Sequence, residues 1–206
     1  MSNILNTAYA VTVDTLATEN GVTIENGVLH VYNDKLKVHL HNEIHEIITS
    51  DTSIVVPKYG SFYSTQTQVP ALETIYAITL NNTDADATSG VSIVDNSKIT
   101  VDATGVYNIQ FSAQLYRSTG GTSKQAIIWL RKNGVDIPAT STHVTMQANA
   151  TYLVASWNFF VKLNAGQNIE LMIWQDDAIQ LLYDQANVTV PYPATPSVIV
   201  TVEKVN

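Results

Sequence analysis

Three histidines and a glutamate recur at alternate positions in the N-terminal part of the chain, where they are the clearest candidates for metal ligands. They are His39, His41, Glu43 and His45. Alternate residues project from one face of an uninterrupted strand, and imidazole and carboxylate groups can bind Zn²⁺ or Ni²⁺. The segment His41-Asn42-Glu43 predicts a turn, however, and a turn breaks this geometry. We therefore expect polar coverage of a hairpin and no bound metal.

Aspartates form two further short clusters. Asp84 and Asp86 offer oxygen ligands for Ca²⁺, but neither EF-hand spacing nor a terminal bidentate glutamate follows them. Asp176 and Asp177 are adjacent at the end of a predicted strand, so they would point to opposite faces. Both clusters indicate solvated loops.

No arrangement typical of an enzyme is found. Ser123 lacks the Gly-x-Ser-x-Gly elbow, and His143 has no recognisable triad setting. No segment indicates the paired carboxylates of a glycosidase, a phosphate loop or a dinucleotide fingerprint. We expect neither enzymatic activity nor a cofactor.

Three tryptophans raise the question of carbohydrate stacking. Trp157 occupies a predicted core position, whereas Trp129 and Trp174 alternate away from the more apolar faces of their strands. The latter two are therefore either exposed or packed at an interface. The loops Tyr116–Lys124 and Ala178–Pro196 are the expected distal features, and loops on rigid sandwiches commonly carry recognition.

The elements that position these residues are strands. Apolar and polar residues alternate with period two almost throughout, and turn pairs such as Asn20-Gly21, Asn133-Gly134 and Ala165-Gly166 interrupt the pattern. Many short strands with frequent turns are typical of an all-β sandwich or barrel.

Composition limits the partners. The chain has 10 basic and 18 acidic residues, a formal charge of −8, and this charge disfavours nucleic acid and anionic membranes. Cysteine is absent, which excludes disulfides and thiolate metal sites. The first residues lack a signal-peptide pattern, and no apolar run approaches the roughly 20 residues of a membrane span. We expect a soluble protein made in a cytoplasm.

The chain is predicted to divide near residues 50–60. Residues 1–57 contain short strands and end in a hairpin with the arms Leu36–Leu40 and Ile44–Ile48, whereas residues 58–206 form one domain of about eight to ten strands. A module as small as the first buries too little apolar surface alone. We expect it to need a docking partner or further copies of itself.

Two strands, Gly105–Leu115 and Thr151–Leu163, carry the main functional prediction. Their inward series is apolar, while the opposite faces are uncharged and partly aromatic. The residues of these faces are Asn108, Gln110, Ser112, Gln114, Tyr116, Tyr152, Val154, Ser156, Asn158 and Phe160. Solvent-facing strands usually carry charge, and interface cores are depleted of it. Lys124, Arg131, Lys132 and Glu170 lie on or beside other strands, so one sheet is expected against protein and the other in solvent. The alternative is that the amides coat an ordinary neutral surface.

Three spaced motifs resemble, in order, the strands of tumour-necrosis-factor-like and complement-head-like jelly rolls. They are Gly105-Val106-Tyr107-Asn108-Ile109-Gln110-Phe111, Ile128-Trp129-Leu130-Arg131-Lys132-Asn133-Gly134 and Val161-Lys162-Leu163-Asn164-Ala165-Gly166-Gln167-Asn168-Ile169-Glu170-Leu171. The resemblance covers residues 61–206 and implies an antiparallel jelly-roll β-sandwich. It also implies a homotrimer whose inner sheets meet at the three-fold axis, which would place the ten uncharged-face residues at the trimer interface.

Two N-terminal segments resemble virion proteins of tailed phages, namely Gly21–Leu29 and Asp34–Val38 with its hairpin. The resemblance implies a phage surface protein, and the lack of a long fibre shaft suits a capsid decoration (cement) protein. We expect a trimer on the outer capsid surface, assembled in the host cytoplasm, whose residues 1–49 bind the major capsid protein. The alternative is a tail-fibre or spike tip that binds a host-surface glycan or protein, and a glycan-cleaving enzyme is a third reading.

Overall fold

A computed structural model describes residues 56–118, 121–186 and 189–205, together with the backbone of five strands in the N-terminal part. The chain separates into two compact units, residues 1–56 and residues 57–206. We call the first the N-terminal unit and the second the head.

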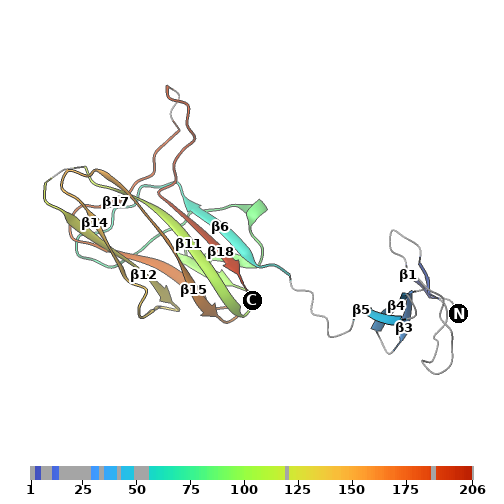
Figure 1. Cartoon of the computed structure of the whole chain (residues 1–206). Coiled ribbons are helices and arrows are strands. Elements are labelled where there is room, and N and C mark those ends of the chain that lie inside the picture. The colour runs from blue at the N-terminus through green and yellow to red at the C-terminus, as the bar shows by residue number, and fades with distance from the viewer. Residues whose placement is uncertain are drawn as a thin grey trace. The chain divides into compact units, whose positions relative to one another are not determined.

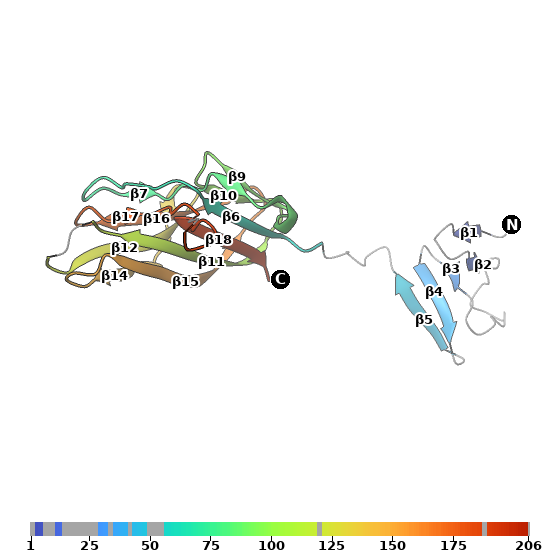
Figure 2. The ribbon, with the colours of Figure 1, turned by 90° about the horizontal axis from the view of Figure 1, so that it is seen from above.

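The strands of the N-terminal unit form two small antiparallel sheets. They are β1 (Asn3–Leu5) with β2 (Val11–Val13), and β3 (Leu29–Tyr32), β4 (Lys35–Leu40) and β5 (Glu43–Ile48) as a meander (Figure 2). The predicted hairpin is confirmed by the pairing of β4 with β5. This pairing sets Val38 opposite His45 and His39 opposite Ile44, so the two histidines are not cross-strand partners.

The head consists of two packed antiparallel sheets. Sheet I runs in the order β15 (Tyr152–Leu163), β11 (Gly105–Tyr116), β18 (Val198–Lys204), β6 (Tyr59–Ser64) and β8 (Asn82–Thr83), with β17 (Gln180–Leu181) also on β11. Sheet II runs β13 (Val135–Asp136), β12 (Lys124–Lys132), β16 (Asn168–Gln175), β10 (Lys98–Val101) and β9 (Val91–Val94), with β14 (Thr142–Met146) on β12 and β7 (Tyr76–Ala77) on β16. Figure 1 shows β11, β15, β18 and β6 side by side in one layer.

The connections establish the fold class. The chain crosses from one sheet to the other between β10 and β11, β11 and β12, β14 and β15, and β15 and β16. Neighbours within a sheet are therefore mostly distant in sequence, as β6, β18, β11 and β15 show. This is the topology of a jelly roll, and it confirms the predicted all-β antiparallel sandwich.

The core lies between the two sheets. Tyr107, Ile109, Phe111, Ala113 and Leu115 of β11 are all buried, as period-two alternation predicts. The facing layer of sheet II is equally apolar. It comprises Ala126, Ile128, Leu130, Ile169, Leu171 and Ile173. Burying one valine, leucine or isoleucine side chain contributes about 1.5–3 kcal/mol, so both layers of this core stabilise the head.

An aromatic cluster closes one side of the core. Phe111 meets Trp157 edge to face, with 4.6 Å between ring centroids, and stacks on Phe159 at 6.4 Å. Such pairs add about 0.5–1.5 kcal/mol beyond burial. The core position predicted for Trp157 is confirmed, although Trp157, Phe159 and Leu153 are only partly buried.

The turn that Asn133-Gly134 predicts is present in the structure. Asn133 and Gly134 join β12 to β13 with φ of 47° and 80°, a two-residue turn that requires a left-handed backbone at both positions. The one described helix is the single turn η1 (Ala85–Ala87). The described part of the head has thirteen strands, four of them only two residues long, so nine match the expected eight to ten.

We expect residues 57–206, produced alone, to fold as they do in the full chain, because every described residue of the hydrophobic core lies among them. All three tryptophans also belong to this fragment. The near-ultraviolet circular dichroism of the fragment should therefore match that of the full chain, with one cooperative thermal transition. A fragment without near-ultraviolet signal would show that the head depends on the N-terminal unit.

Candidate functional site

The outer face of sheet I carries all ten residues that the sequence predicts at an interface. The register of β11 with β15 sets them directly opposite one another, in five pairs. The pairs are Asn108–Phe160, Gln110–Asn158, Ser112–Ser156, Gln114–Val154 and Tyr116–Tyr152. The structure therefore brings the ten residues together into one continuous strip, which we call the amide strip.

The amide strip exposes a large apolar and aromatic surface. Tyr152, Val154 and Phe160 are 68%, 55% and 64% exposed. Tyr116 and Tyr152 pack with 5.0 Å between ring centroids, and Asn158 Nδ2 donates to Asn108 Oδ1 at 3.0 Å. The strip is thus partly organised before any partner binds.

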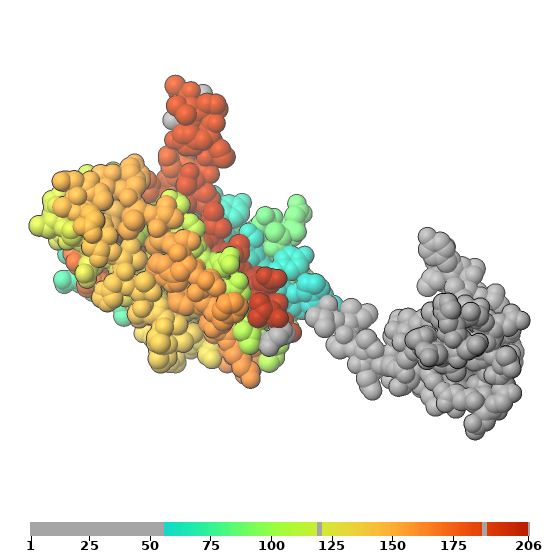
Figure 3. All heavy atoms as spheres, viewed as in Figure 1, coloured from blue at the N-terminus to red at the C-terminus, as the bar shows by residue number. Residues whose placement is uncertain are grey.

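Strands β18 and β6 widen this face. Figure 3 shows β15, β11, β18 and β6 across one surface of the head. Ile199 and Thr201 lie opposite Ser112 and Gln110, which extends the uncharged area. Ile199 and Thr201 alternate with the buried Val198, Val200 and Val202, and this alternation in the sequence could have predicted their place on the outer face.

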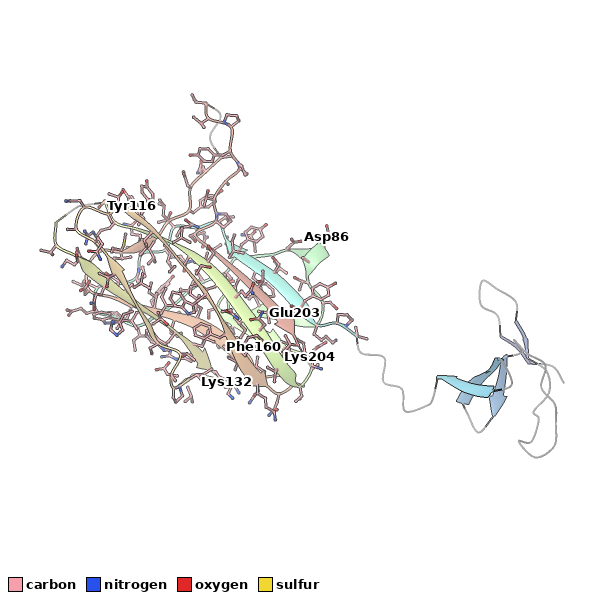
Figure 4. The ribbon with its side chains drawn as sticks, viewed as in Figure 1. Asp86, Tyr116, Lys132, Phe160, Glu203 and Lys204 are labelled. Atoms are coloured by element: carbon pink, nitrogen blue, oxygen red, sulfur yellow. The ribbon has the colours of Figure 1, made fainter. Side chains whose placement is uncertain are left out.

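Charged residues border the uncharged face at one end. Glu203 lies opposite Asn108, and Lys162 lies opposite Val106, so charge enters at one end of the face. Figure 4 labels Glu203 and Phe160 toward this end and Tyr116 at the other. The charge-free area therefore runs from Gln110 and Asn158 to Tyr116 and Tyr152.

Sheet II carries the cations that the sequence placed away from the amide strip. Lys124, Arg131 and Lys132 lie on β12 and are partly exposed. Glu170 does not fit the expected solvated side, since it is only 7% exposed and accepts from Ser97 Oγ at 2.6 Å. Hydrogen bonding by Ser97 makes burial of this carboxyl tolerable.

Both remaining tryptophans lie on the outer face of sheet II, as their alternation predicts. The expectation that both are exposed or at an interface is wrong for Trp129, which is buried within its own chain and hydrogen-bonded to Asp136. Trp174 is opposite Ile127, and Trp129 is opposite Met172. They line an open pocket of about 590 Å³, which we call the Trp pocket. Its lining comprises Ile75, Ile127, Trp129, Asp136, Ile137, Pro138, Ser141 and Trp174.

A carboxylate fixes one wall of the Trp pocket. Trp129 Nε1 and Arg131 Nε both donate to Asp136 Oδ1, each at 2.8 Å. These two hydrogen bonds, from Arg131 first and Trp129 second, lower the pKa of Asp136 below its usual 3.8. Asp136 therefore stays ionised at neutral pH, and Trp129, only 8% exposed, is held against it.

The other candidate sites have structural roles. Asp84 accepts from the Asp86 backbone N–H at 3.2 Å and caps η1, and Asp176 accepts from the Gln125 N–H at 2.8 Å. Ser123 contacts Gln147 at 3.4 Å. Among the described residues, no three histidine, aspartate or glutamate side chains gather as metal ligands would. The metal-site hypothesis for His39, His41, Glu43 and His45 concerns side chains that lie outside the described residues.

A buried arginine was missed in the sequence. Arg117 is 1% exposed and directly follows β11. Its Nη1 donates to the Thr122 carbonyl at 3.1 Å, and Asp177 Oδ2 lies 3.9 Å away. Nε and Nη2 have no hydrogen-bond partner among the described atoms. Arg117 continues the alternate inward-facing positions of β11, and this alternation predicts a core position. Arginine is rarely buried, however, so its residue type argued against that position.

Comparisons with known proteins give remote structural likeness only. No family model and no curated protein matches the chain. The globular domain of zebrafish complement 1qA protein is similar at 13% identity and a TM-score of 0.45, over 73% of this chain and 98% of that one. Murine APRIL is similar at 10% identity and a TM-score of 0.45, over 73% and 100%. No described helix has the length and hydropathy needed to span a membrane.

We expect Asp136→Asn to destabilise the head at neutral pH, because the amide keeps the shape but loses the charge that Arg131 and Trp129 stabilise. A carboxyl with a lowered folded-state pKa stabilises above its unfolded value of 3.8, and this stabilisation is lost as pH falls through the folded pKa. The difference in urea midpoint between the two proteins should therefore shrink below about pH 3.8. Asp136 is half exposed, so the effect is small. An equal difference at pH 7 and pH 3 would contradict the ion-pair explanation.

Proposed function

We propose that this chain is a self-associating structural protein whose heads meet as a homotrimer through the outer face of sheet I. The observation that carries the proposal is the amide strip, in which ten uncharged residues from two strands form one outward-facing surface whose five β15 members are exposed. An ordinary solvent-facing sheet carries lysine and glutamate at such positions, whereas interface cores lose charge and gain aromatic residues.

The physical gain from association comes from the exposed apolar side chains. Phe160, Tyr152 and Val154 lie on the edge strand β15, and Ile199 adds apolar surface on β18. Covering these groups removes apolar area from water at about 25 cal/mol per Å². The amides can pair with one another across the contact, so no charge is stranded there. The resemblance of the strand motifs to trimeric jelly rolls is what favours three copies.

The biological setting in this proposal is the outer surface of a phage capsid. Support comes from the N-terminal segments that resemble phage virion modules and from the separation of the chain into two units. In this arrangement residues 1–49 bind the major capsid protein and the heads associate above it. Since only an assembled shell offers every docking site, each bound trimer stabilises the shell by mass action.

One observation favours a second candidate, a tail-fibre or spike tip. The Trp pocket is a preformed hollow on the face opposite the amide strip, where a trimer leaves it accessible. A receptor-binding tip needs such a pocket, whereas a capsid stiffener does not. Copy number per particle separates the two, because decoration needs hundreds of copies and fibres need a few dozen at most.

We expect the full chain to have about three times its monomer mass of 22.5 kDa in light scattering. Gln110→Glu and Asn158→Asp should each weaken the trimer, because symmetry brings three like charges into a desolvated contact. The loss should be larger near pH 8 than near pH 5, since burial raises the pKa of a carboxyl and protonation relieves the repulsion.

Gln125→Glu is the matched control for this test. It makes the same chemical change at an exposed position on β12, in the other sheet. Dissociation is followed by light scattering against concentration at both pH values. A monomeric wild-type chain at micromolar concentration, or equal behaviour of all three variants, would refute the interface.

A separate experiment addresses the capsid. Full-length protein should rebind to phage capsids that lack it, in hundreds of copies visible by electron microscopy. Residues 57–206 should not bind, because the docking strands lie in the N-terminal unit. Equal decoration by the fragment would contradict the docking role, and density confined to the tail would favour the receptor-binding tip.

A further inference from the structure

We propose that the Trp pocket is a binding site for a neutral saccharide. The proposal concerns the face of the head that the amide strip does not use, and it holds whether or not the chain decorates a capsid.

The pocket lining combines apolar and polar side chains, and a sugar likewise has an apolar face and polar hydroxyls. One face of a pyranose ring presents C–H groups, while its rim presents hydroxyls. Trp174, Ile127 and Ile75 supply an aromatic and aliphatic wall for the C–H face. Trp174 is only partly buried, so its indole is available for stacking. A volume of about 590 Å³ falls within the range of small-ligand sites and accommodates a short oligosaccharide.

Polar groups sit at the edge of this wall. Asp136 uses only Oδ1 in its hydrogen bonds to Trp129 and Arg131, and no described donor reaches Oδ2. The side chain of Asp136 is half exposed, so Oδ2 can accept from a hydroxyl in a charge-assisted bond. Ser141, an exposed residue of the lining, offers a hydroxyl that can donate or accept.

The pocket is preorganised, which lowers the entropic cost of binding. The two hydrogen bonds to Asp136 Oδ1 hold the carboxylate, the guanidinium and the Trp129 indole in one arrangement. Trp129 and Trp174 project from neighbouring paired strands, so the sheet itself sets their spacing. Less ordering is then required when the ligand arrives.

Charge selects the class of saccharide. Asp136 stays ionised because its pKa is lowered, and Arg131, the nearest cation, is already paired with it. The chain as a whole carries −8. A sialic or uronic acid would meet long-range repulsion and would find no lysine or arginine in the pocket lining, whereas a neutral hexose chain needs none.

The test uses the full chain and a panel of tetrasaccharides. The panel contains neutral glucose, galactose and mannose oligomers, a galacturonic acid oligomer, and a proline-rich decapeptide as the competing type of occupant. Binding is followed by tryptophan fluorescence and calorimetry. We expect at least one neutral oligomer to bind with a Kd of about 1 mM or lower and the acidic oligomer to bind at least about tenfold more weakly. No neutral binder, or preferential binding of the peptide, would overturn the proposal.

Variants then locate the site. Trp174→Ala should weaken binding of the best oligomer about tenfold or more, because the stacking surface is lost. Asp136→Asn changes no volume and should also weaken it severalfold, so it tests the site even if Trp174→Ala fails to fold. Tyr192→Ala, an exposed aromatic on the segment between β17 and β18, should bind as the wild type does. Unchanged affinity in Trp174→Ala and Asp136→Asn would place the sugar elsewhere and refute the site.

Discussion

The pairing of β11 with β15 is the interaction on which the rest of the head depends. It runs without a bulge from Gly105 opposite Leu163 to Tyr116 opposite Tyr152. A strand has two faces, so this one register sends Tyr107 through Leu115 into the core and the amide strip outward. A slip of one residue would exchange the two sets and expose Phe111. The same register therefore determines which residues are buried and which are on the surface, so neither set can change without the other.

The two outer faces of the sandwich differ in how far their large side chains are exposed. On sheet I the outer face of the long strands lies open, and Tyr152, Val154 and Phe160 remain largely exposed. On sheet II Met172 and Trp129 are nearly buried although they face outward, and the Trp129 indole is hydrogen-bonded to Asp136 of β13. The Trp pocket lies on this second face. An open apolar face suits self-association, whereas a face with a hollow suits a small ligand.

Charge contributes little to the stability of this head. Its close ion pairs among the described residues are Lys58 with Asp102 at 2.7 Å, Lys98 with Asp95 at 2.7 Å and Arg131 with Asp136 at 2.8 Å. They are at the surface, where such pairs are worth about 0–1 kcal/mol. Stability therefore rests on the apolar layer and on the strand ladders. The few charges act locally instead: Arg131 holds Asp136, and Asp136 holds Trp129.

The amino-acid sequence by itself determined the fold class, the inward series of β11 and the shared character of the ten amide-strip residues. These follow from alternation along single strands, and alternation is visible in sequence. It also placed Trp129 and Trp174 away from the core. What only the tertiary structure decided was which distant strands meet. It set Glu203 beside Asn108, buried Arg117 and Glu170, and placed Asp136 against Trp129. Those outcomes depend on the register between strands that are far apart in the chain, and such a register produces no periodic pattern within any one segment of the sequence.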